Sequence, residues 1–300
     1  MRLLEVPARG FTTRFAPAPT GFLHLGHVAN AIAVWGLARA FGGRVQLRIE
    51  DHDQSRCRPE YEAALFEDLS WLGFEADEAP VRQSERAALY EEALTRLADK
   101  GLVYACDCSR RTIAEASSPG ASELRYGGRC RSRDVSLAAT PARRVRLAAE
   151  EIAFGDLRLG PLSQNPALQC GDVLLRDRNG HWTYQFAVVV DDLAQGVDLV
   201  IRGEDLLAST GRQILIARLL GSEAPPRFLH HPLILREDGH KLSKSNRDTG
   251  VRDLRAASWT RERVLGAAAR ALGISDGDPM TFAQCVEALR RSATESRGSV

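Results

Sequence analysis

The sequence predicts an α/β fold with a parallel sheet, interrupted by an inserted segment. Between residues 12 and 98, short apolar runs alternate with amphipathic helical patterns, which is typical of a parallel sheet covered by helices. From 101 to 177 the alternation gives way to cysteines, arginines and short β-like runs, and it resumes near Tyr184. We therefore expect two halves of one fold on either side of an insertion.

The elements are predicted in chain order from periodicity and from turn residues. A strand is expected to end at Phe15, and a Pro- and Gly-containing turn leads into the first helix. The remaining expected elements of the first half are a helix over Leu25–Phe41, a strand over Arg44–Ile49, and helices over Pro59–Leu72 and Glu85–Lys100. Later elements are β-like pieces at Arg143–Leu147 and Asp172–Leu175, a regular segment at Ile214–Leu220, a strand at Leu233–Leu235, and helices at Arg261–Leu272 and Phe282–Arg291.

The turn before the first helix has the composition of a phosphate site. A helix N-terminus offers unpaired N–H groups and a dipole that favours anions, and Gly21 and Gly26 permit close approach. His24 and His27 are three residues apart, so their rings can project from one side of the first turn and donate to phosphate oxygens. Taken alone, this spacing also fits a capped surface helix with two solvated histidines.

A second motif, Lys241-Leu242-Ser243-Lys244-Ser245, lies in a Gly-, Ser- and Asp-rich stretch that predicts a loop. Lysines on a loop can close over a triphosphate and neutralise it. Alone, the motif also fits a basic solvent-exposed loop. The two motifs in this order predict a site that holds ATP phosphates from two sides and makes an adenylate.

These motifs resemble the signatures of class I aminoacyl-tRNA synthetases, with His24 to His27 in place of H-I-G-H and Lys241 to Ser245 in place of K-M-S-K-S. Four other segments resemble motifs of the glutamyl branch of that class: Arg14–Gly21, Leu47–Asp51, Tyr184–Asp192 and Val200–Asp205. The resemblance covers the chain from Thr13 to about Lys244. It implies a class I synthetase Rossmann-type nucleotide-binding fold with a zinc-containing insertion and a short helical C-terminal segment.

The resemblance and the alternation together divide the chain into four parts. We expect the first half of the catalytic fold at 1–100, an acceptor-like insertion with a zinc site at 101–183, the second half at 184–245, and a helical C-terminal segment at 246–300. Full-length members of the branch carry an anticodon-binding region after K-M-S-K-S. The fifty-five residues after Ser245 are too few for another domain of ordinary size, so no such domain is expected.

The chain resembles most the truncated paralogues of this branch, the glutamyl-Q tRNA(Asp) synthetases. That resemblance implies a ligase that activates L-glutamate with ATP and Mg²⁺ and transfers it to the queuosine base in the anticodon of tRNA(Asp). It implies catalytic roles for His24, His27, Lys241 and Lys244. It also implies ATP contacts from His24, Gly26, His27 and Lys244.

The candidate glutamate-binding residues lie at predicted strand ends and in the family motifs: Arg14, Ala16, Ala18, Glu50, Tyr184 and Arg202. Ligands of such sheets bind at the carboxyl ends of the strands, where the strand order reverses. Arg14 and Arg202 suit carboxylates, because the guanidinium fork binds them bidentately. Glu50 can pair with the α-ammonium, and a glutamine would leave a buried guanidinium unpaired. Taken singly, Glu50 also fits an ordinary ion pair, and Tyr184 fits a core residue.

Cys106, Cys108, Tyr126 and Cys130 lie together in the insertion. Three thiolates and one oxygen can complete a tetrahedral zinc site, although unpaired structural thiols remain an alternative and iron also suits thiolates. The resemblance implies one structural Zn²⁺, because glutamyl-Q enzymes and some glutamyl synthetases carry a C-x-C…Y-x-x-x-C set on these four positions. Six cysteines in 300 residues do not make a disulfide scaffold.

Composition bounds the remaining expectations. The net charge of +1 argues against bulk attraction to RNA, but nine arginines against three acids between residues 110 and 146 predict a local basic patch for phosphates. Without a long apolar run or a secretory pattern, the sequence predicts no transmembrane helix and favours the cytoplasm. We expect a monomer.

Three alternatives stay open at this stage. A short glutamyl-tRNA synthetase would charge tRNA(Glu) at its 3′ end. A catalytically silent paralogue would only bind RNA, although it would have no need of His24, Gly26, His27, Lys241 and Lys244. The cysteine stretch can also be a zinc-binding module with a partner of its own.

Overall fold

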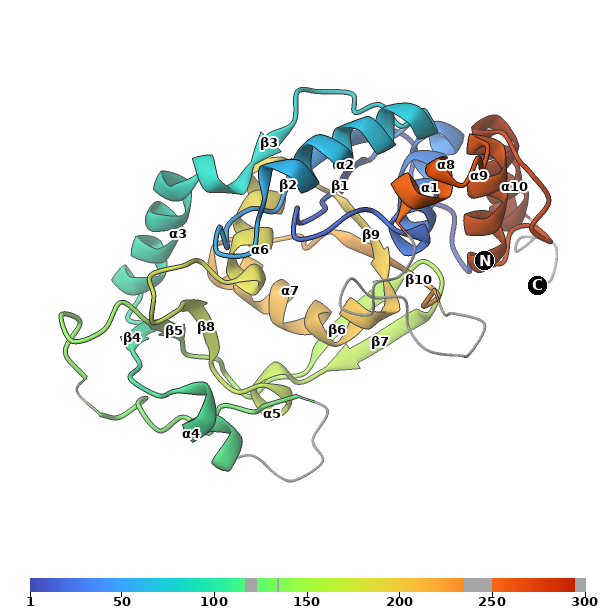
Figure 1. Ribbon diagram of the computed structural model, residues 1–300. Helices are drawn as coiled ribbons and strands as arrows, with labels where there is room; N and C mark the ends of the chain where they lie inside the picture. Colours follow the sequence, from blue (N-terminus) through green and yellow to red (C-terminus); the bar gives the residue numbers. More distant parts are fainter. Residues whose placement is uncertain (117–122, 134, 235–249, 295–300) are drawn as a thin grey trace.

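The structure is a computed structural model that describes residues 1–116, 123–133, 135–234 and 250–294 (Figure 1). Its first half contains β1 (Thr12–Phe15), α1 (Leu25–Phe41), β2 (Arg44–Ile49), α2 (Pro59–Leu72), β3 (Val81–Arg82), a 3₁₀ turn (Gln83–Glu85) and α3 (Ala87–Asp99). The middle contains β4 (Val103–Ala105), α4 (Arg110–Glu115), β5 (Arg143–Val145), β6 (Ile152–Asp156), β7 (Gly160–Gln164), α5 (Pro166–Gln169) and β8 (Val173–Arg176). The rest contains α6 (Tyr184–Ala194), β9 (Leu199–Gly203), a 3₁₀ segment (Glu204–Ser209), α7 (Thr210–Leu219), β10 (Arg227–His231), α8 (Val251–Ala256), α9 (Arg261–Ala271) and α10 (Phe282–Thr294).

The central sheet is parallel except at one edge, and its strand order reverses between β1 and β9. One ladder runs β1-β2-β3, and a second runs β7-β6-β10-β9, in which only the β6–β7 pair is antiparallel. The two ladders meet where the N–H of Asp198 donates to the carbonyl of Thr12 at 3.1 Å. The strand order therefore reverses at β1 and β9, and the carboxyl ends of these two strands define the expected ligand crevice.

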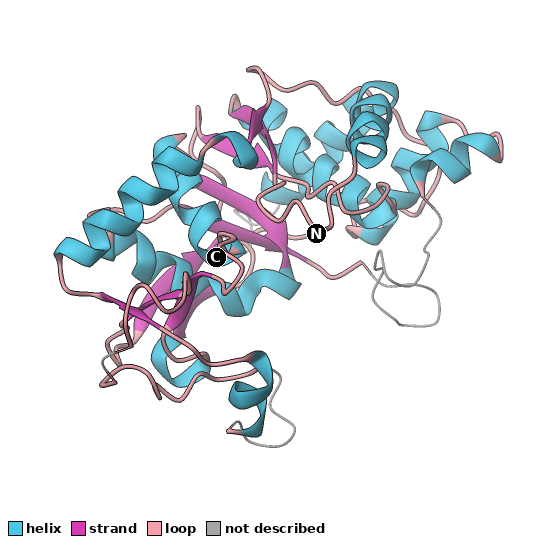
Figure 2. Ribbon diagram, turned by 60° about the vertical axis from the view of Figure 1, so that its left-hand side comes forward, coloured by secondary structure: helices cyan, strands magenta, loops and turns pink. Residues whose placement is uncertain are grey.

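Strand residues alternate between two cores on opposite faces of the sheet, with helices on both sides (Figure 2). On β9, Leu199 and Ile201 belong to the core that contains α1, whereas Val200 belongs to the core that contains α6 and α7. On β10, Leu229 belongs to the core that contains α1, and Phe228 belongs to the core that contains α6 and α7. This period of two follows from strand geometry and makes β9 and β10 buried on both faces.

Residues 31–38 of helix α1 are all buried, because the helix is covered from two sides. It packs against β1, β2 and β9 on one side and against α9 and α10 on the other. A Cβ on Gly36 would lie 2.4 Å from Leu289 of α10, so the two helices approach closely at this glycine. The C-terminal helices therefore fix α1, whose N-terminus carries the first motif.

The insertion forms a separate antiparallel sheet, β4-β5-β8, which lies opposite α9 and α10 in the view of Figure 1. The β6–β7 hairpin falls within the range predicted for the insertion, yet β6 pairs with β10, through Phe228 and Asp156. The hairpin thus extends the central sheet.

Several predicted bounds differ from the structure; for example, α7 begins at Thr210, before Ile214, and α10 runs to Thr294, beyond Arg291. The strand expected at Leu233–Leu235 is wrong for its described residues: β10 ends at His231, and Leu233 and Ile234 have no strand pairing, while Leu235 lies outside the described residues. Pro232 explains the difference, because it cannot donate to a ladder. The helix expected from Glu85 begins at Ala87, after a 3₁₀ turn. Among the described residues, no helix is both long and apolar enough to cross a membrane.

Candidate active site and metal centre

The first motif forms the N-terminus of α1, where its two histidines cap the helix. The Nδ1 atom of His24 accepts the N–H of Gly26 at 3.1 Å, and the Nδ1 atom of His27 accepts the N–H of His24 at 3.1 Å. In a neutral imidazole the proton is then on Nε2, so each ring keeps its N–H donor on the side away from the cap. Gly26 is needed for a local reason, since a Cβ there would lie 2.9 Å from the ring of His24.

A cavity of about 340 Å³ opens at this helix terminus and at the ends of β9 and β10. Its lining consists of His24, Gly26, His27, Asn30, Arg202, Gly203, Asp205, Leu206, His231, Leu233 and Ile234. The volume is in the range of small-molecule sites. The cavity thus combines a helix N-terminus, which favours phosphate, with the carboxyl end of β9.

One described end of the 235–249 gap lines this cavity, and the other contacts a residue that lines it. Ile234 lines it, and Gly250 pairs with His24 in an isolated bridge, beside a 2.7 Å hydrogen bond from the N–H of Val251 to the carbonyl of Leu23. Lys241 and Lys244, which the sequence predicts as catalytic, lie outside the described residues.

One buried electrostatic cluster is formed by side chains from four different elements: Arg14, Glu50, Tyr184 and Arg202. Arg14 is at the end of β1, Glu50 follows β2, Tyr184 begins α6 and Arg202 is on β9. Burial raises the pKa of Tyr184, Arg202 and Arg14 oppose the shift, and Glu50 adds to it. The four side chains thus lie close enough to interact electrostatically, and of the four Arg202 is the one that lines the cavity.

Arg202 is a buried cation whose hydrogen-bond partners are neutral. Its Nε donates to Nε2 of His230 at 3.0 Å, Nη1 to Gln213 at 2.6 Å and Nη2 to Thr210 at 2.8 Å. In the described part of the chain no carboxylate lies within 4.0 Å of this guanidinium, which is 4% exposed, and burial lowers the pKa of Arg202. An uncompensated buried charge is costly, so the site favours an anionic ligand.

Arg14, in contrast, already contacts a carboxylate of the protein. Its Nε lies 3.1 Å from Asp192, and Arg48 lies 2.7 Å from the same carboxylate. Burial would raise the pKa of Asp192, but these two arginines hold it below its ordinary value. Arg14 is therefore held in place by an ion pair through its Nε atom.

Arg48 is the site residue that sequence reasoning missed. It is fully buried and lies 3.3 Å from Glu50 and 3.7 Å from Asp191 in addition to its contact with Asp192. In the sequence it was noted only as part of the Leu47–Asp51 motif. An arginine between the apolar residues of a predicted central strand was the available signal, because such a position faces the interior.

Ala16 and Ala18 belong to the turn that leaves β1. This turn is fixed to the end of β2, since the N–H of Glu50 donates to the carbonyl of Pro17 at 3.0 Å. Both alanines are half-buried, and they flank Pro17, whose carbonyl accepts this hydrogen bond.

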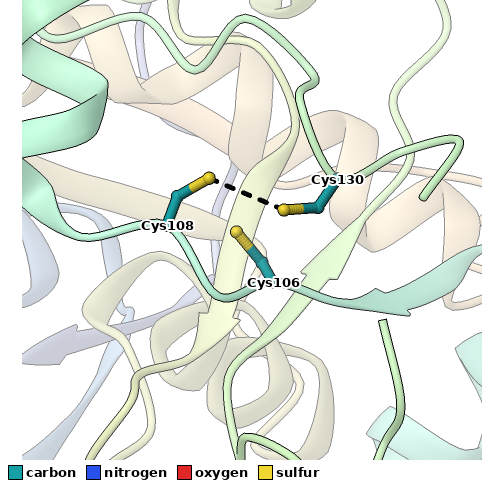
Figure 3. Close-up of side chains that lie close together, drawn as sticks. All are labelled: Cys106, Cys108 and Cys130. Carbon is teal, nitrogen blue, oxygen red and sulfur yellow. Dashed lines mark hydrogen bonds between the residues drawn. The ribbon is translucent and has the colours of Figure 1, made fainter. Parts of the chain in front are cut away.

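The structure brings three of the four predicted metal ligands into one cluster, shown in Figure 3. The Sγ atoms of Cys108 and Cys130 lie 3.5 Å apart, and Tyr126 Oη lies 3.6 Å from Cys106 Sγ. Zn–S bonds of about 2.3 Å in a tetrahedron require ligand separations of about 3.8 Å. The fourth predicted ligand, Tyr126, thus adjoins the thiols, and the donor set fits one tetrahedral zinc ion.

Arg144 contacts two of these four side chains from within the sheet. Its guanidinium lies 3.8 Å from the ring centre of Tyr126, and its Nε donates to Cys106 Sγ at 3.3 Å. Burial would raise the pKa of Cys106, but hydrogen bonds from Arg144 and Tyr126 lower it. Arg144 therefore favours the thiolate that a metal needs.

The predicted basic patch divides into structural and exposed arginines. Arg144 is buried beneath the cysteines, and Arg143 donates to three backbone carbonyls of its own loop. Exposed members include Arg110, Arg125 and Arg129. Fewer of the nine arginines are thus available to phosphates than the sequence count suggests.

The strand reversal, the histidine-capped helix and the buried arginine cluster define a catalytic domain of the class I nucleotide-binding type. The family model described as tRNA synthetases class I (E and Q), catalytic domain, matches residues 11–296. The chain belongs to this family of ligases, as the sequence motifs predicted.

Its curated relatives are more specific. The glutamyl-Q tRNA(Asp) synthetase of Leptothrix cholodnii is 43% identical over 92% of this chain and 95% of that protein. The protein of the same name from Nitratidesulfovibrio vulgaris is 39% identical over 95% of this chain and 93% of its own length.

Among solved structures, a glutamate tRNA ligase from Elizabethkingia meningosepticum in complex with its amino acid superposes with a TM-score of 0.76 at 26% identity. That match covers 93% of this chain and 64% of the ligase. This chain therefore spans less than two thirds of the length of the ligase.

Proposed function

We propose that this protein activates L-glutamate with ATP and transfers the glutamyl group to the queuosine base in the anticodon of tRNA(Asp). The observation that carries the proposal is Arg202, a buried guanidinium without a carboxylate partner among the described residues, on the wall of the cavity capped by His24 and His27. The proposal is supported by the 43% identity to a glutamyl-Q tRNA(Asp) synthetase, against 26% to a glutamate tRNA ligase.

In the proposed first step, a carboxylate oxygen of glutamate attacks the α-phosphorus of ATP, and the bond to pyrophosphate breaks. His24 and His27 donate from Nε2 to the phosphate oxygens, and Lys241 and Lys244 offset their charge. Gly26 leaves room for the histidine rings at the helix terminus. Mg²⁺ bound with ATP would supply further charge neutralisation.

The glutamate itself is proposed to lie against the buried cluster. Arg202 and Arg14 bind its carboxylates, and Tyr184 donates a hydrogen bond. Burial raises the pKa of Glu50 despite the neighbouring Arg48, so an α-ammonium there would relieve an unfavourable charge. The turn with Ala16 and Ala18 closes the site.

In the second step, a hydroxyl of the cyclopentenediol ring of queuosine attacks the carbonyl of the mixed anhydride. A new ester bond forms, AMP leaves, and the hydroxyl proton is released.

Pyrophosphate exchange with glutamate and ATP, first without RNA, tests the activation step. Labelled glutamate is then offered with tRNA(Asp) that carries or lacks queuosine, and with tRNA(Glu). Exchange followed by transfer only to queuosine-containing tRNA(Asp) is expected. A base-labile 3′ ester on tRNA(Glu) would instead identify a charging synthetase, and no exchange under any condition would identify a silent RNA-binding paralogue.

We further propose that Cys106, Cys108, Tyr126 and Cys130 hold one structural Zn²⁺, and that the enzyme acts as a cytoplasmic monomer. Zinc would supply a cross-link within the insertion and no chemistry in activation. Sedimentation analysis tests the monomer, and metal analysis of the purified protein tests the zinc.

Replacing Arg144 with methionine is expected to weaken zinc retention about tenfold or more, since residues that orient metal ligands typically have effects of this size. The change removes the charge against Cys106 and Tyr126 while keeping an apolar chain. Competition with a zinc chelator measures the effect. The exposed Arg129→Met variant is the matched control, and equal zinc retention in both variants would contradict the role of Arg144.

A further inference from the structure

We propose that Asp156 and His230 are positioning residues that hold Arg202 in the orientation that binds a carboxylate of glutamate. The inference rests on the proposed function and adds two residues outside the family motifs discussed above.

The three side chains form a line across three adjacent parallel strands. Asp156 ends β6, His230 is on β10 and Arg202 is on β9, with exposed fractions of 1%, 0% and 4%. Nδ1 of His230 lies 2.7 Å from Asp156 Oδ2, and Nε2 of His230 accepts Arg202 Nε at 3.0 Å. The register sets this line, because His230 pairs with Arg202 and Phe228 pairs with Asp156.

The hydrogen bonds between Asp156 and His230 and between His230 and Arg202 permit a single tautomer of the neutral His230 imidazole. Arginine donates only, so Nε2 of His230 must carry the lone pair and Nδ1 must carry the proton that Asp156 accepts. A doubly protonated ring would direct its Nε2–H against the N–H of Arg202. Burial agrees with this arrangement, since it lowers the pKa of His230 despite the neighbouring Asp156.

The carboxylate of Asp156 thereby acts on Arg202 through the imidazole of His230. A carboxylate in direct contact would compete with the substrate for the guanidinium, as Asp192 contacts Arg14. Behind a neutral histidine, Asp156 instead makes Nε2 a stronger acceptor and fixes one edge of the guanidinium. Arg202 lines the cavity, and each of its Nη atoms carries a second N–H, beyond the one bonded to Gln213 or Thr210, that can donate to a substrate carboxylate.

Both carboxylate oxygens of Asp156 accept hydrogen bonds, so the side-chain amide of an asparagine cannot replace this carboxylate without rearrangement. Its Oδ1 accepts the N–H groups of Arg158 at 3.0 Å and Leu159 at 2.9 Å, and its Oδ2 accepts the N–H of His230 at 3.0 Å as well as Nδ1. An asparagine has a single oxygen, so its NH₂ must meet N–H donors or force the imidazole proton to Nε2. In the second case that proton opposes Arg202.

The test is the kinetics of pyrophosphate exchange in Asp156→Asn. We expect the KM for glutamate to rise about tenfold or more, in the range found for groups that orient a binding residue, with the KM for ATP within about twofold of wild type. Glutamate titration calorimetry, which needs no turnover, should show the same loss of affinity. Asp68→Asn, which changes another buried carboxylate on α2, is the matched control and should leave the KM for glutamate unchanged.

A second pair of variants decides the case if Asp156→Asn does not fold. His230→Gln can keep an acceptor for Arg202, whereas His230→Asn can keep only the contact with Asp156, so the glutamine variant should bind glutamate more tightly. Equal affinities, or KM values for ATP and glutamate that rise together, would overturn the inference. Wild-type protein without exchange would contradict the proposed function, whereas wild-type exchange with an unchanged glutamate KM in folded Asp156→Asn would contradict only the inference.

Discussion

Replacing Arg202 with glutamine is expected to reduce kcat/KM for glutamate about a hundredfold or more, because breaking a buried charge pair costs about 3–5 kcal/mol. The guanidinium is buried among His230, Gln213 and Thr210, and none of these offers a negative charge. The substrate carboxylate would therefore be its charge partner. Glutamine at this position keeps polar contacts but removes the charge.

The same variant should lose discrimination between glutamate and glutamine. In the wild type, a bound glutamine amide would leave the buried guanidinium without a carboxylate, which is the kind of mismatch that binding sites reject strongly. Competitive pyrophosphate exchange with both amino acids measures the ratio. Arg227→Gln, which changes an exposed arginine paired with Glu5 at the start of β10, is the control. Undiminished selectivity in Arg202→Gln would remove this residue from the glutamate site.

Elements with strong local signals were predicted to the residue. The bounds of α1 and α2 agree with the sequence analysis, since each helix ends at a glycine in the left-handed region, Gly42 with φ 70° and Gly73 with φ 82°. Pro59 opens α2 at a position where its missing N–H has no intrahelical partner to lose. Signals of this kind act within a few residues, so a sequence shows them directly.

What the sequence analysis could not supply depends on pairing between distant strands. The β6–β7 hairpin has no local mark that assigns it to the central sheet, yet this pairing brings Asp156 to His230. Asp192 was part of a recognised motif, but its contacts with Arg14 and Arg48 span more than a hundred residues of sequence. Motif reasoning thus found the residues that we propose to bind glutamate more readily than those that orient them.

The small number of lysines in the chain bears on the role of the second motif, Lys241 to Ser245. Of the forty Lys and Arg residues, only Lys100, Lys241 and Lys244 are lysines. Two of the three therefore lie in one five-residue motif of an otherwise arginine-rich chain. A compact ammonium on a flexible stem suits a phosphate that changes position during displacement, whereas arginine prefers a fixed planar partner. The composition thus favours a role for this motif that arginine would not serve equally well.

Replacing Lys244 with alanine is expected to slow adenylate formation about a hundredfold or more, the usual cost of removing one group that stabilises transition-state charge. The described residues before and after the 235–249 gap are Ile234, which lines the cavity of His24, and Gly250, which pairs with His24. The lost ammonium should therefore affect the phosphates of ATP and leave glutamate binding unchanged. Single-turnover formation of glutamyl-adenylate, with glutamate titration calorimetry alongside, measures both.

The three lysines also provide their own control. Lys100 is exposed at the end of α3 and donates to the carbonyl of Leu219, so Lys100→Ala should retain the wild-type rate. Lysine acylation followed by mass spectrometry should show ATP protecting Lys241 and Lys244 but not Lys100. Wild-type adenylate formation in Lys244→Ala, or equal reactivity of all three lysines with and without ATP, would show that this motif does not act on the nucleotide. The phosphates would then depend on the helix terminus and its two histidines alone.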